Sequence, residues 1–152
     1  MIVASCDRLF KITPSSLIMT IESNKQVVLS YVEAFNRCDL ETLKGLFTPD
    51  ALVYGVLGWG ELDKVIPIWQ ELHQAFGIKL TVEEIIAEGD TVAVRYTESG
   101  VFIGDFRGHK STGKQYELVA MEWFTLQDGK IHRRWGARDS ASQARQIGMP
   151  LA

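Results

Sequence analysis

The sequence lacks the features that define several large classes of protein. No stretch of its 152 residues approaches the ~20 consecutive apolar residues that a membrane-spanning helix needs. The net charge of −3 gives no electrostatic reason to expect binding to nucleic acid or to an anionic membrane surface. The two cysteines, Cys6 and Cys38, show no CxxC or other metal-ligand spacing. We therefore expect single thiols, no metal site and a reducing, cytoplasmic compartment.

The composition is that of a globular domain, with 46% hydrophobic and 23% charged residues. A chain of this length can form one domain with a sizeable core. Asp7, Arg8 and Lys11 interrupt the apolar segment that a signal peptide would need, so we expect none. Residues 1–18 show neither helical nor strand periodicity. We predict that they form a loosely ordered N-terminal extension and that residues 19–152 form a single domain.

The first half of the chain has the spacing of helices. Ser23, with a glutamine three residues later, matches a capping box, and the apolar residues that follow predict a helix to about Arg37. Asp39 is a suitable cap for a second helix, which the sequence TPD ends. After the short strand ALVYGVL, a third helix is predicted over 63–76. Pro67 should lie close to its start, where a missing N–H costs little.

After these helices the apolar period changes from 3.6 to 2. The strands KLTVEEIIAE and TVAVRYTESGVFI are joined by a Gly-Asp turn, and QYELVAMEWFTL and IHRRWGARD by an Asp-Gly turn. The tail SASQARQIGMPLA is polar and predicts a turn or a short helix. The order of elements indicates an α+β fold, in which three N-terminal helices pack on one face of a strongly curved antiparallel sheet.

Two carboxylates lie on strands in unusual places. The strand YELVAMEWF is apolar at both parities, which predicts a central strand buried on both faces, and Glu122 shares a face with Ala120 and Phe124. Such a carboxylate lies at a wet edge, in a pocket with a shifted pKa, in an oligomer interface, or in a buried pair with an arginine such as Arg133. Asp139 would share a face with the tryptophan of WGARD. It is either a solvated acid at the strand end or part of a pocket.

The segments AFNRCDLETL, EEIIAEGDTVAVRYTESG, IGDFRG followed by TGK, DGKI, and WGARD followed by QIGMP occur in order between about Asn24 and Pro150. With them the chain resembles the SnoaL-like polyketide cyclases. These share a cone-shaped fold with nuclear transport factor two, ketosteroid isomerase and limonene epoxide hydrolase. The resemblance implies a central, mostly apolar cavity for a hydrophobic small molecule of polycyclic or terpenoid size. It also implies ring closure by intramolecular aldol chemistry without metal or cofactor.

The resemblance also implies site residues. The acid after the tryptophan of the last strand, Asp139, would be the general acid/base, and the polar residue of the first helix would be Asn36, which could equally be a helix C-terminal residue without a chemical role. Glu122 is the second candidate carboxylate. Phe102 stands where the family has a histidine, and a phenyl ring can neither donate a hydrogen bond nor carry a proton. His109 in the nearby loop could replace it or could simply be solvated.

The aromatic residues are predicted to lie mostly in the core, and some of them to line the cavity; the candidates are Tyr31, Phe35, Tyr54, Trp59, Trp69, Tyr96, Phe102, Phe106, Trp123 and Trp135. Three functions remain open. The first is a cofactor-independent enzyme with an acid/base carboxylate, and the second is a binding or dimerisation module without chemistry, which Phe102 favours. The third is an isomerase or epoxide hydrolase, which needs a second carboxylate beside Asp139, and Glu122 is the one available. Open sheets of this fold pack face to face, so a homodimer is expected.

Overall fold

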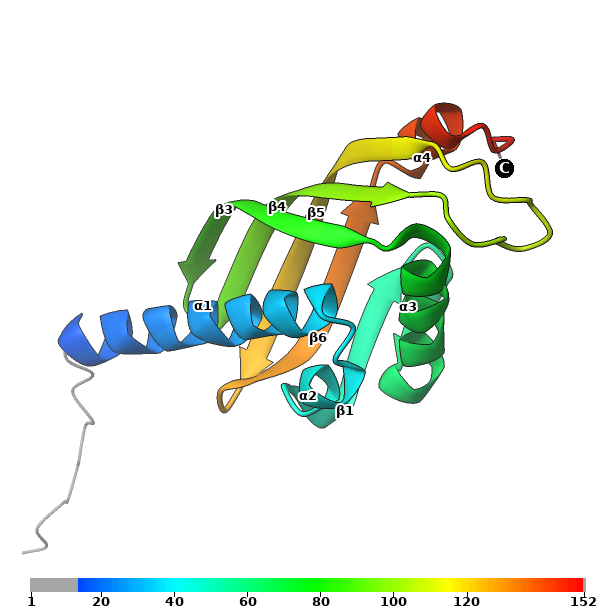
Figure 1. Cartoon of the computed structure of the whole chain (residues 1–152). Coiled ribbons are helices and arrows are strands. Elements are labelled where there is room, and N and C mark those ends of the chain that lie inside the picture. The colour runs from blue at the N-terminus through cyan, green and yellow to red at the C-terminus, as the bar shows by residue number, and fades with distance from the viewer. Residues whose placement is uncertain (1–13, 152) are drawn as a thin grey trace, which may run out of the picture.

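The structure is a computed structural model and describes residues 14–151. Its helices and strands follow one another along the chain as α1 Pro14–Asn36, α2 Leu40–Lys44, β1 Phe47–Gly55, β2 Gly58–Glu61, α3 Leu62–Phe76, β3 Lys79–Glu88, β4 Thr91–Val101, β5 Gln115–Gln127, β6 Lys130–Arg138 and α4 Ser140–Ile147 (Figure 1). Most of the predicted N-terminal extension, residues 1–13, lies outside the described residues. Within the described part, no helix is both long and apolar enough to span a membrane.

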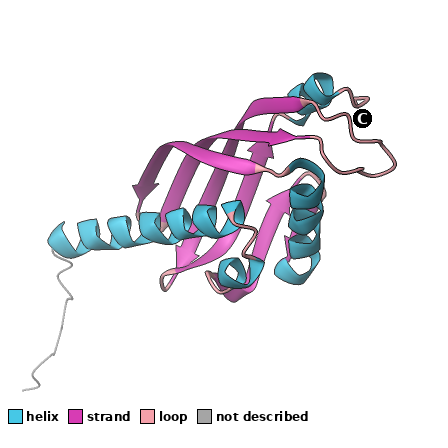
Figure 2. Ribbon diagram, viewed as in Figure 1, coloured by secondary structure: helices cyan, strands magenta, loops and turns pink. Residues whose placement is uncertain are grey.

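One mixed sheet organises the fold, with strand order β2-β1-β6-β5-β4-β3. Helices α1, α2 and α3 lie on one face of it, and α4 lies at one end (Figure 2). The predicted α+β fold and the four long antiparallel strands are confirmed. The sheet is not wholly antiparallel, however, because β1 pairs with β6 in parallel. Three helices do precede β3, but β1 and β2 come between α2 and α3.

Irregular pairing bends the sheet at three places. The register shifts between Val82 and Glu84 on β3, between Thr125 and Leu126 on β5, and within β1. An extra residue in one strand bends that strand and increases its local twist. These shifts account for the curvature that gives the sheet a hollow inner face.

The first helix begins earlier than its polar residues suggested. Ser23 lies inside α1, which starts at Pro14, so the predicted helix start is wrong. Proline is well suited to the first position of a helix. Asn24 is buried, and its side-chain amide donates to the backbone oxygen of Gly89 in the β3–β4 turn, at 3.3 Å. The polar residues near Ser23 thus include a contact to the sheet rather than a helix terminus. Asp39 caps α2 as predicted, through the backbone N–H of Thr42.

The two faces of the sheet differ in what covers them. On β5, Leu118, Ala120, Glu122, Phe124 and Leu126 are buried, while Val119, Met121 and Trp123 between them are exposed. We call the buried side the inner face and the opposite side the outer face. The prediction that β5 is buried on both faces is wrong, because the helices cover the inner face alone (Figure 2). The outer face is open and carries exposed apolar side chains among polar ones, including Val119, Met121 and Trp123.

Candidate active site

A cavity of about 620 Å³ lies between the inner face of the sheet, α3 and α4. Its size falls within the ~300–1,000 Å³ that is usual for small-molecule sites. Phe35 from α1, Trp69 and Leu72 from α3, and Ile147 from α4 contribute to its apolar lining. Of the aromatic residues predicted to line a cavity, Phe35, Trp69 and Phe106 do so; Trp59 borders it from the edge strand β2, while its ring packs on the outer face against Tyr54 and Trp135.

The first polar group in the cavity wall is a buried ion pair. Glu122 is 7% exposed, and its carboxylate accepts two hydrogen bonds from Arg134, at 3.0 Å from Nε and 2.8 Å from Nη2. The guanidinium also lies against the ring of Trp69, 5.6 Å from its centroid. Burial disfavours the charged guanidinium, but Glu122 outweighs this and raises the pKa of Arg134 above its usual value. The predicted partner, Arg133, instead donates to backbone oxygens, including that of Asp50.

Arg134 lies on β6, and the pairing of β6 with β5 fixes which residues of β6 face inward. Glu122 lies opposite Gly136 in register, and Phe124 lies opposite Arg134, so both β6 residues face inward. A Cβ atom at Gly136 would lie 2.7 Å from Nη1 and 2.9 Å from Cζ of Arg134. The glycine therefore leaves the space that the guanidinium needs to lie across the strand toward Glu122.

A second buried pair joins β4 to the end of β6. Glu98 is 2% exposed and accepts hydrogen bonds from Nε and Nη2 of Arg138, the first at 3.0 Å. Tyr116 donates its hydroxyl to the same carboxylate at 3.0 Å. Burial and the nearby Glu98 raise the pKa of Tyr116, so its hydroxyl stays protonated. Glu98 and Arg138 line the cavity together with Glu122 and Arg134.

Sequence reasoning missed Glu98, although a signal for it was present. In TVAVRYTESG, Glu98 has the same parity as Val92, Val94 and Tyr96, all of which are buried. This is the pattern that singled out Glu122, a carboxylate on the apolar face of a strand.

Two further tyrosines lie beside the first ion pair. Tyr31 and Tyr96 were predicted to line the cavity, but they are fully buried in the core and are not part of its wall. Neither hydroxyl has a hydrogen-bond partner among residues 14–151. Burial raises the pKa of both groups, and the charges of Glu122 and Arg134 act on them. Both hydroxyls are therefore protonated, and that of Tyr31 lies close enough to Glu122 and Arg134 to interact with them.

Asp139 does not lie in the cavity wall. It is the N-cap of α4, where its carboxylate accepts the backbone N–H of Ser142 at 2.9 Å, and it is exposed. Trp135 and Asp139 do follow the same alternation. However, Trp135 lies opposite Trp123, which is on the outer face. Residues of β6 with the same parity as Trp135 therefore face away from the cavity. The geometry gives Asp139 a structural task at the start of α4.

The remaining predicted positions are also engaged elsewhere. The side chain of Asn36 accepts from the backbone N of Leu80 at 2.8 Å and donates to its O at 2.9 Å, which fastens α1 to β3. Phe102 is fully buried against Phe76, with 5.3 Å between ring centroids, and is not part of the cavity wall. His109 forms an isolated backbone pair within the loop between β4 and β5 and does not line the cavity either.

Three predicted cavity aromatics lie on the outer face instead. Tyr54 lies opposite Trp59 and Trp135 in register, and Trp135 lies opposite Trp123. Tyr54 is 42% exposed and Trp123 is 52% exposed. The placement of Tyr54, Trp123 and Trp135 in the cavity is thus corrected, because the parity of β1, β5 and β6 directs them away from the helices.

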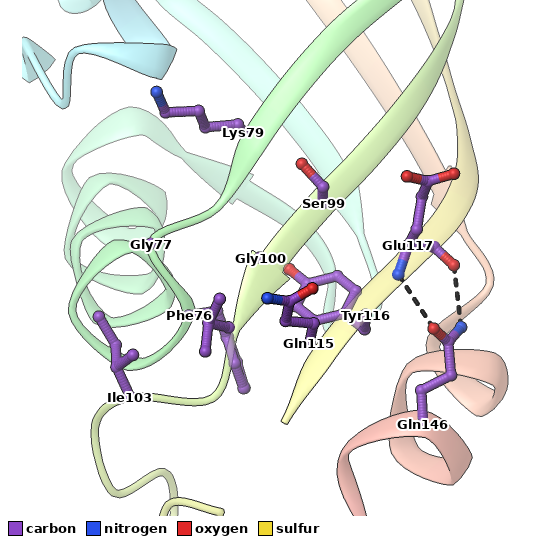
Figure 3. A pocket seen from close by; sticks show the side chains of 11 residues that line it. Phe76, Gly77, Lys79, Ser99, Gly100, Ile103, Gln115, Tyr116, Glu117 and Gln146 are labelled. Atoms are coloured by element: carbon purple, nitrogen blue, oxygen red, sulfur yellow. Dashed lines mark hydrogen bonds between the residues drawn. The ribbon is translucent and has the colours of Figure 1, made fainter. Parts of the chain in front are cut away.

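A second hollow, of about 590 Å³, lies between the end of α3, strands β3–β5 and α4 (Figure 3). It includes Lys79, Ser99 and Glu117, whose strand positions have the outer-face parity. It is open to solvent, and neither Glu98 nor Glu122 lines it. The more enclosed cavity with its buried ion pairs is therefore the better candidate site. Within residues 14–151, no group of His, Cys, Asp and Glu side chains could hold a metal ion.

The family model of the SnoaL-like polyketide cyclases matches residues 25–147. The chain belongs to this family. Among curated proteins, none matches the chain. The SnoaL-like chain is similar to the crystal structure of AclR, a proposed hydroxylase from Streptomyces galilaeus, with 26% identity, a TM-score of 0.78, and 87% of this chain and 85% of AclR covered. It is also similar to IdmH, a proposed polyketide cyclase from Streptomyces antibioticus, with 27% identity, a TM-score of 0.74, and 83% and 99% covered.

One structural neighbour of this SnoaL-like chain belongs to a different functional type. An epoxide hydrolase of M. tuberculosis, described as LEH-like, has 13% identity and a TM-score of 0.68, with 84% of this chain and 91% of that chain covered. At this identity the likeness shows the fold alone. The cone fold is thus shared beyond the SnoaL-like family, and the chemistry has to be argued from the side chains.

Proposed function

We propose that this SnoaL-like protein is a cofactor-independent enzyme that moves a proton on a hydrophobic carbonyl compound held in the cavity. The observation that carries the proposal is the Glu122–Arg134 pair in an otherwise largely apolar wall. A carboxylate is a proton acceptor, and a guanidinium stabilises an oxyanion. Both effects are stronger in a site that excludes water.

The reaction begins when Glu122 takes a proton from the carbon next to the ligand's carbonyl group. The electron pair of that C–H bond forms the enolate, whose negative oxygen is stabilised by the Arg134 guanidinium. In an aldol-type ring closure, the enolate carbon then bonds to a second carbonyl carbon of the same ligand. The resulting alkoxide takes the proton back from Glu122. In an isomerisation, the proton returns to a different carbon.

Glu122 is the better base of the two buried carboxylates. Its two oxygens offer about four lone-pair sites, of which Arg134 occupies two. Glu98 accepts three hydrogen bonds, two from Arg138 and one from Tyr116, and so has less capacity for a substrate proton.

We expect the protein to catalyse exchange of the hydrogens at C2 of 1-tetralone, a bicyclic ketone, in heavy water. Glu122→Gln should lower the exchange rate by at least about 100-fold, because an amide cannot act as the base. Nuclear magnetic resonance of the ketone measures the rate. The control is Asp139→Asn, which removes the charge but keeps a side chain that caps helices equally well. This variant should leave the exchange rate within about twofold of the native rate, because Asp139 caps α4 and does not line the cavity.

Loss of exchange in Asp139→Asn rather than in Glu122→Gln would move the acid/base role back to the α4 cap. If 1-tetralone binds and its exchange stays at the background rate, the protein is a binding module and the proposed enzyme is rejected.

Epoxide hydrolysis is a second candidate, favoured by one observation. The cavity wall holds a second buried carboxylate, Glu98, which sequence reasoning did not find and which lies at a polar position separate from that of Glu122. Opening of styrene oxide that depends on both Glu98 and Glu122 would favour this candidate over proton transfer.

We further propose that the outer face joins two copies of the chain in a homodimer. One row of residues crosses all six strands in register and is apolar throughout; it consists of Trp59, Tyr54, Trp135, Trp123, Ala93 and Ile86. Neighbouring rings of the row pack on one another, with 5.2 Å between the centroids of Tyr54 and Trp59. An exposed apolar row of this length typically marks an interface. A two-fold axis would place each row against its copy.

Trp123→Glu should convert the dimer to a monomer, because it places two carboxylates in an apolar interface and removes a large ring from it. Light scattering coupled to size-exclusion chromatography measures the mass. The control, Ser30→Glu, adds the same charge on the exposed side of α1 and should leave the mass unchanged. A native protein that elutes with the mass of one chain would contradict the proposal.

A further inference from the structure

Helix α4 contributes a buried amide whose nitrogen has no well-formed hydrogen bond to the described part of the chain. Gln143 is 6% exposed and lines the cavity. Its Nε2 group makes no hydrogen bond of good geometry among residues 14–151, and it interacts only weakly with the Tyr116 oxygen, which opposes the rise in the pKa of Tyr116. Buried amide groups are nearly always paired in native proteins. The unpaired Nε2 therefore points to an acceptor that is not part of the chain.

The lack of a partner does not come from a loosely held helix. Gln146, one turn further along α4, donates to the backbone O of Glu117 at 2.8 Å and accepts from its N at 3.0 Å (Figure 3). Thr112 donates to the backbone O of Ile147 at 2.8 Å. These contacts fasten α4 to β5 and to the loop before it, so the position of Gln143 in the cavity wall is fixed.

Arg138 offers further donors to the same part of the cavity. Its Nε and Nη2 atoms bind Glu98, and Nη1 takes no part in that pair. Burial disfavours the positive charge, but the hydrogen bond to Glu98, the charge of Glu98 and the contact with Tyr116 together outweigh this and raise the pKa of Arg138. Arg134 lies four residues earlier on β6, so their Cα atoms are roughly 13 Å apart along the strand. The cavity thus has two separate polar positions on an apolar wall.

We propose that Gln143 and Arg138 bind an oxygen acceptor of the ligand, a carbonyl or phenolate oxygen, at the α4 end of the cavity. The inference rests on the proposed function, since the ligand is the compound on which Glu122 acts. A ligand that reaches both positions is an elongated apolar frame with oxygen functions at two places. Gln143 then fixes which carbonyl lies beside Glu122.

Isothermal titration of two probes of nearly identical shape tests this. Anthraquinone-2-sulfonate carries two carbonyl oxygens that anthracene-2-sulfonate lacks. The native protein should bind the quinone about tenfold more tightly, the effect of one good hydrogen bond in a buried site. Gln143→Met should bring the ratio close to one without weakening the binding of anthracene-2-sulfonate. The control Gln127→Met, at the exposed end of β5, should keep the native ratio.

A native protein without preference for the quinone, or a preference that survives in Gln143→Met, would overturn the inference. The melting temperature gives a second measurement. Loss of an unpaired buried amide should leave it unchanged or raise it. A clear fall in melting temperature would show that the amide stabilises the fold, which also overturns the inference.

The two proposals fail in different ways. If neither probe binds the native protein, the acceptor site is rejected, while the proposed chemistry is still decided by the exchange of 1-tetralone. If the probes behave as expected but Glu122→Gln leaves the exchange rate of 1-tetralone unchanged, the acceptor site stands and the proposed chemistry alone is rejected.

Discussion

Arg134→Leu is expected to lower the free energy of unfolding by about 3–5 kcal/mol, because it leaves the Glu122 carboxylate buried without a partner. The side chains of Arg134 and Glu122 are 12% and 6% exposed, so water cannot replace the lost hydrogen bonds without a rearrangement of the core. Urea denaturation followed by circular dichroism measures the change. The double variant Glu122→Gln with Arg134→Leu should recover much of the loss, because no unpaired charge remains.

An exposed pair on the same sheet provides the control. Arg95 and Glu84 approach to 3.6 Å with side chains that are 45% and 63% exposed. Arg95→Leu should therefore change the free energy of unfolding by no more than about 0.5 kcal/mol. If Arg134→Leu is as mild as this control, the Glu122 carboxylate reaches water, and its environment does not strengthen the electrostatic effects on which the proposed chemistry depends.

The strands of this fold could be predicted from the sequence far better than the surfaces that they form. The period of two, together with the Gly-Asp and Asp-Gly turns, marks β3–β6 almost to the residue, since these are local signals. The start of α1 could not be predicted, because the contact between Asn24 and Gly89 joins residues 65 positions apart. The prediction that β5 is buried on both faces failed for a similar reason. Apolar residues at both parities show that both faces of a strand are apolar, but they do not show which face the helices cover.

The candidate site was likewise predictable from the sequence only in part. Glu122 could be recognised from its parity, and Glu98 could have been recognised from the same signal. Their partners could not be, because the choice between Arg133 and Arg134 depends on the register shift between Thr125 and Leu126. That shift changes which β6 residues face inward, and no local pattern in the sequence marks it.

Asp139 shows how a resemblance can outweigh a local signal. The sequence DSAS has the pattern of a helix N-cap, an aspartate followed by a serine within hydrogen-bond reach. The tail was predicted as a turn or short helix, and α4 confirms the helix. The cap marks where β6 ends, although it does not decide which residues of β6 face inward.

Gly136→Ala should remove the geometry of the site without removing any of its charged groups. The added Cβ would meet Arg134 at 2.7 Å from Nη1 and 2.9 Å from Cζ. A free arginine end would move aside at little cost, but this one is held by two hydrogen bonds to Glu122 and by the ring of Trp69. Displacing it should cost about 1–3 kcal/mol of stability, as for other overpacked sites. It should also lower the exchange rate of 1-tetralone. Urea denaturation and nuclear magnetic resonance measure the two effects.

A thermodynamic cycle separates this cause from the general cost of a methyl group in a strand. In the Arg134→Leu background the guanidinium is gone, so Gly136→Ala should cost far less than in the native protein, with a coupling of about 1 kcal/mol or more between the two positions. Gly55→Ala is the matched control. It also changes a strand glycine that borders the cavity, but nothing lies within 4 Å of its added Cβ. Equal costs for Gly136→Ala in both backgrounds would mean that Gly136 is needed by the strand itself. The glycine of the family-like segment WGARD would then say nothing about the ion pair beside it.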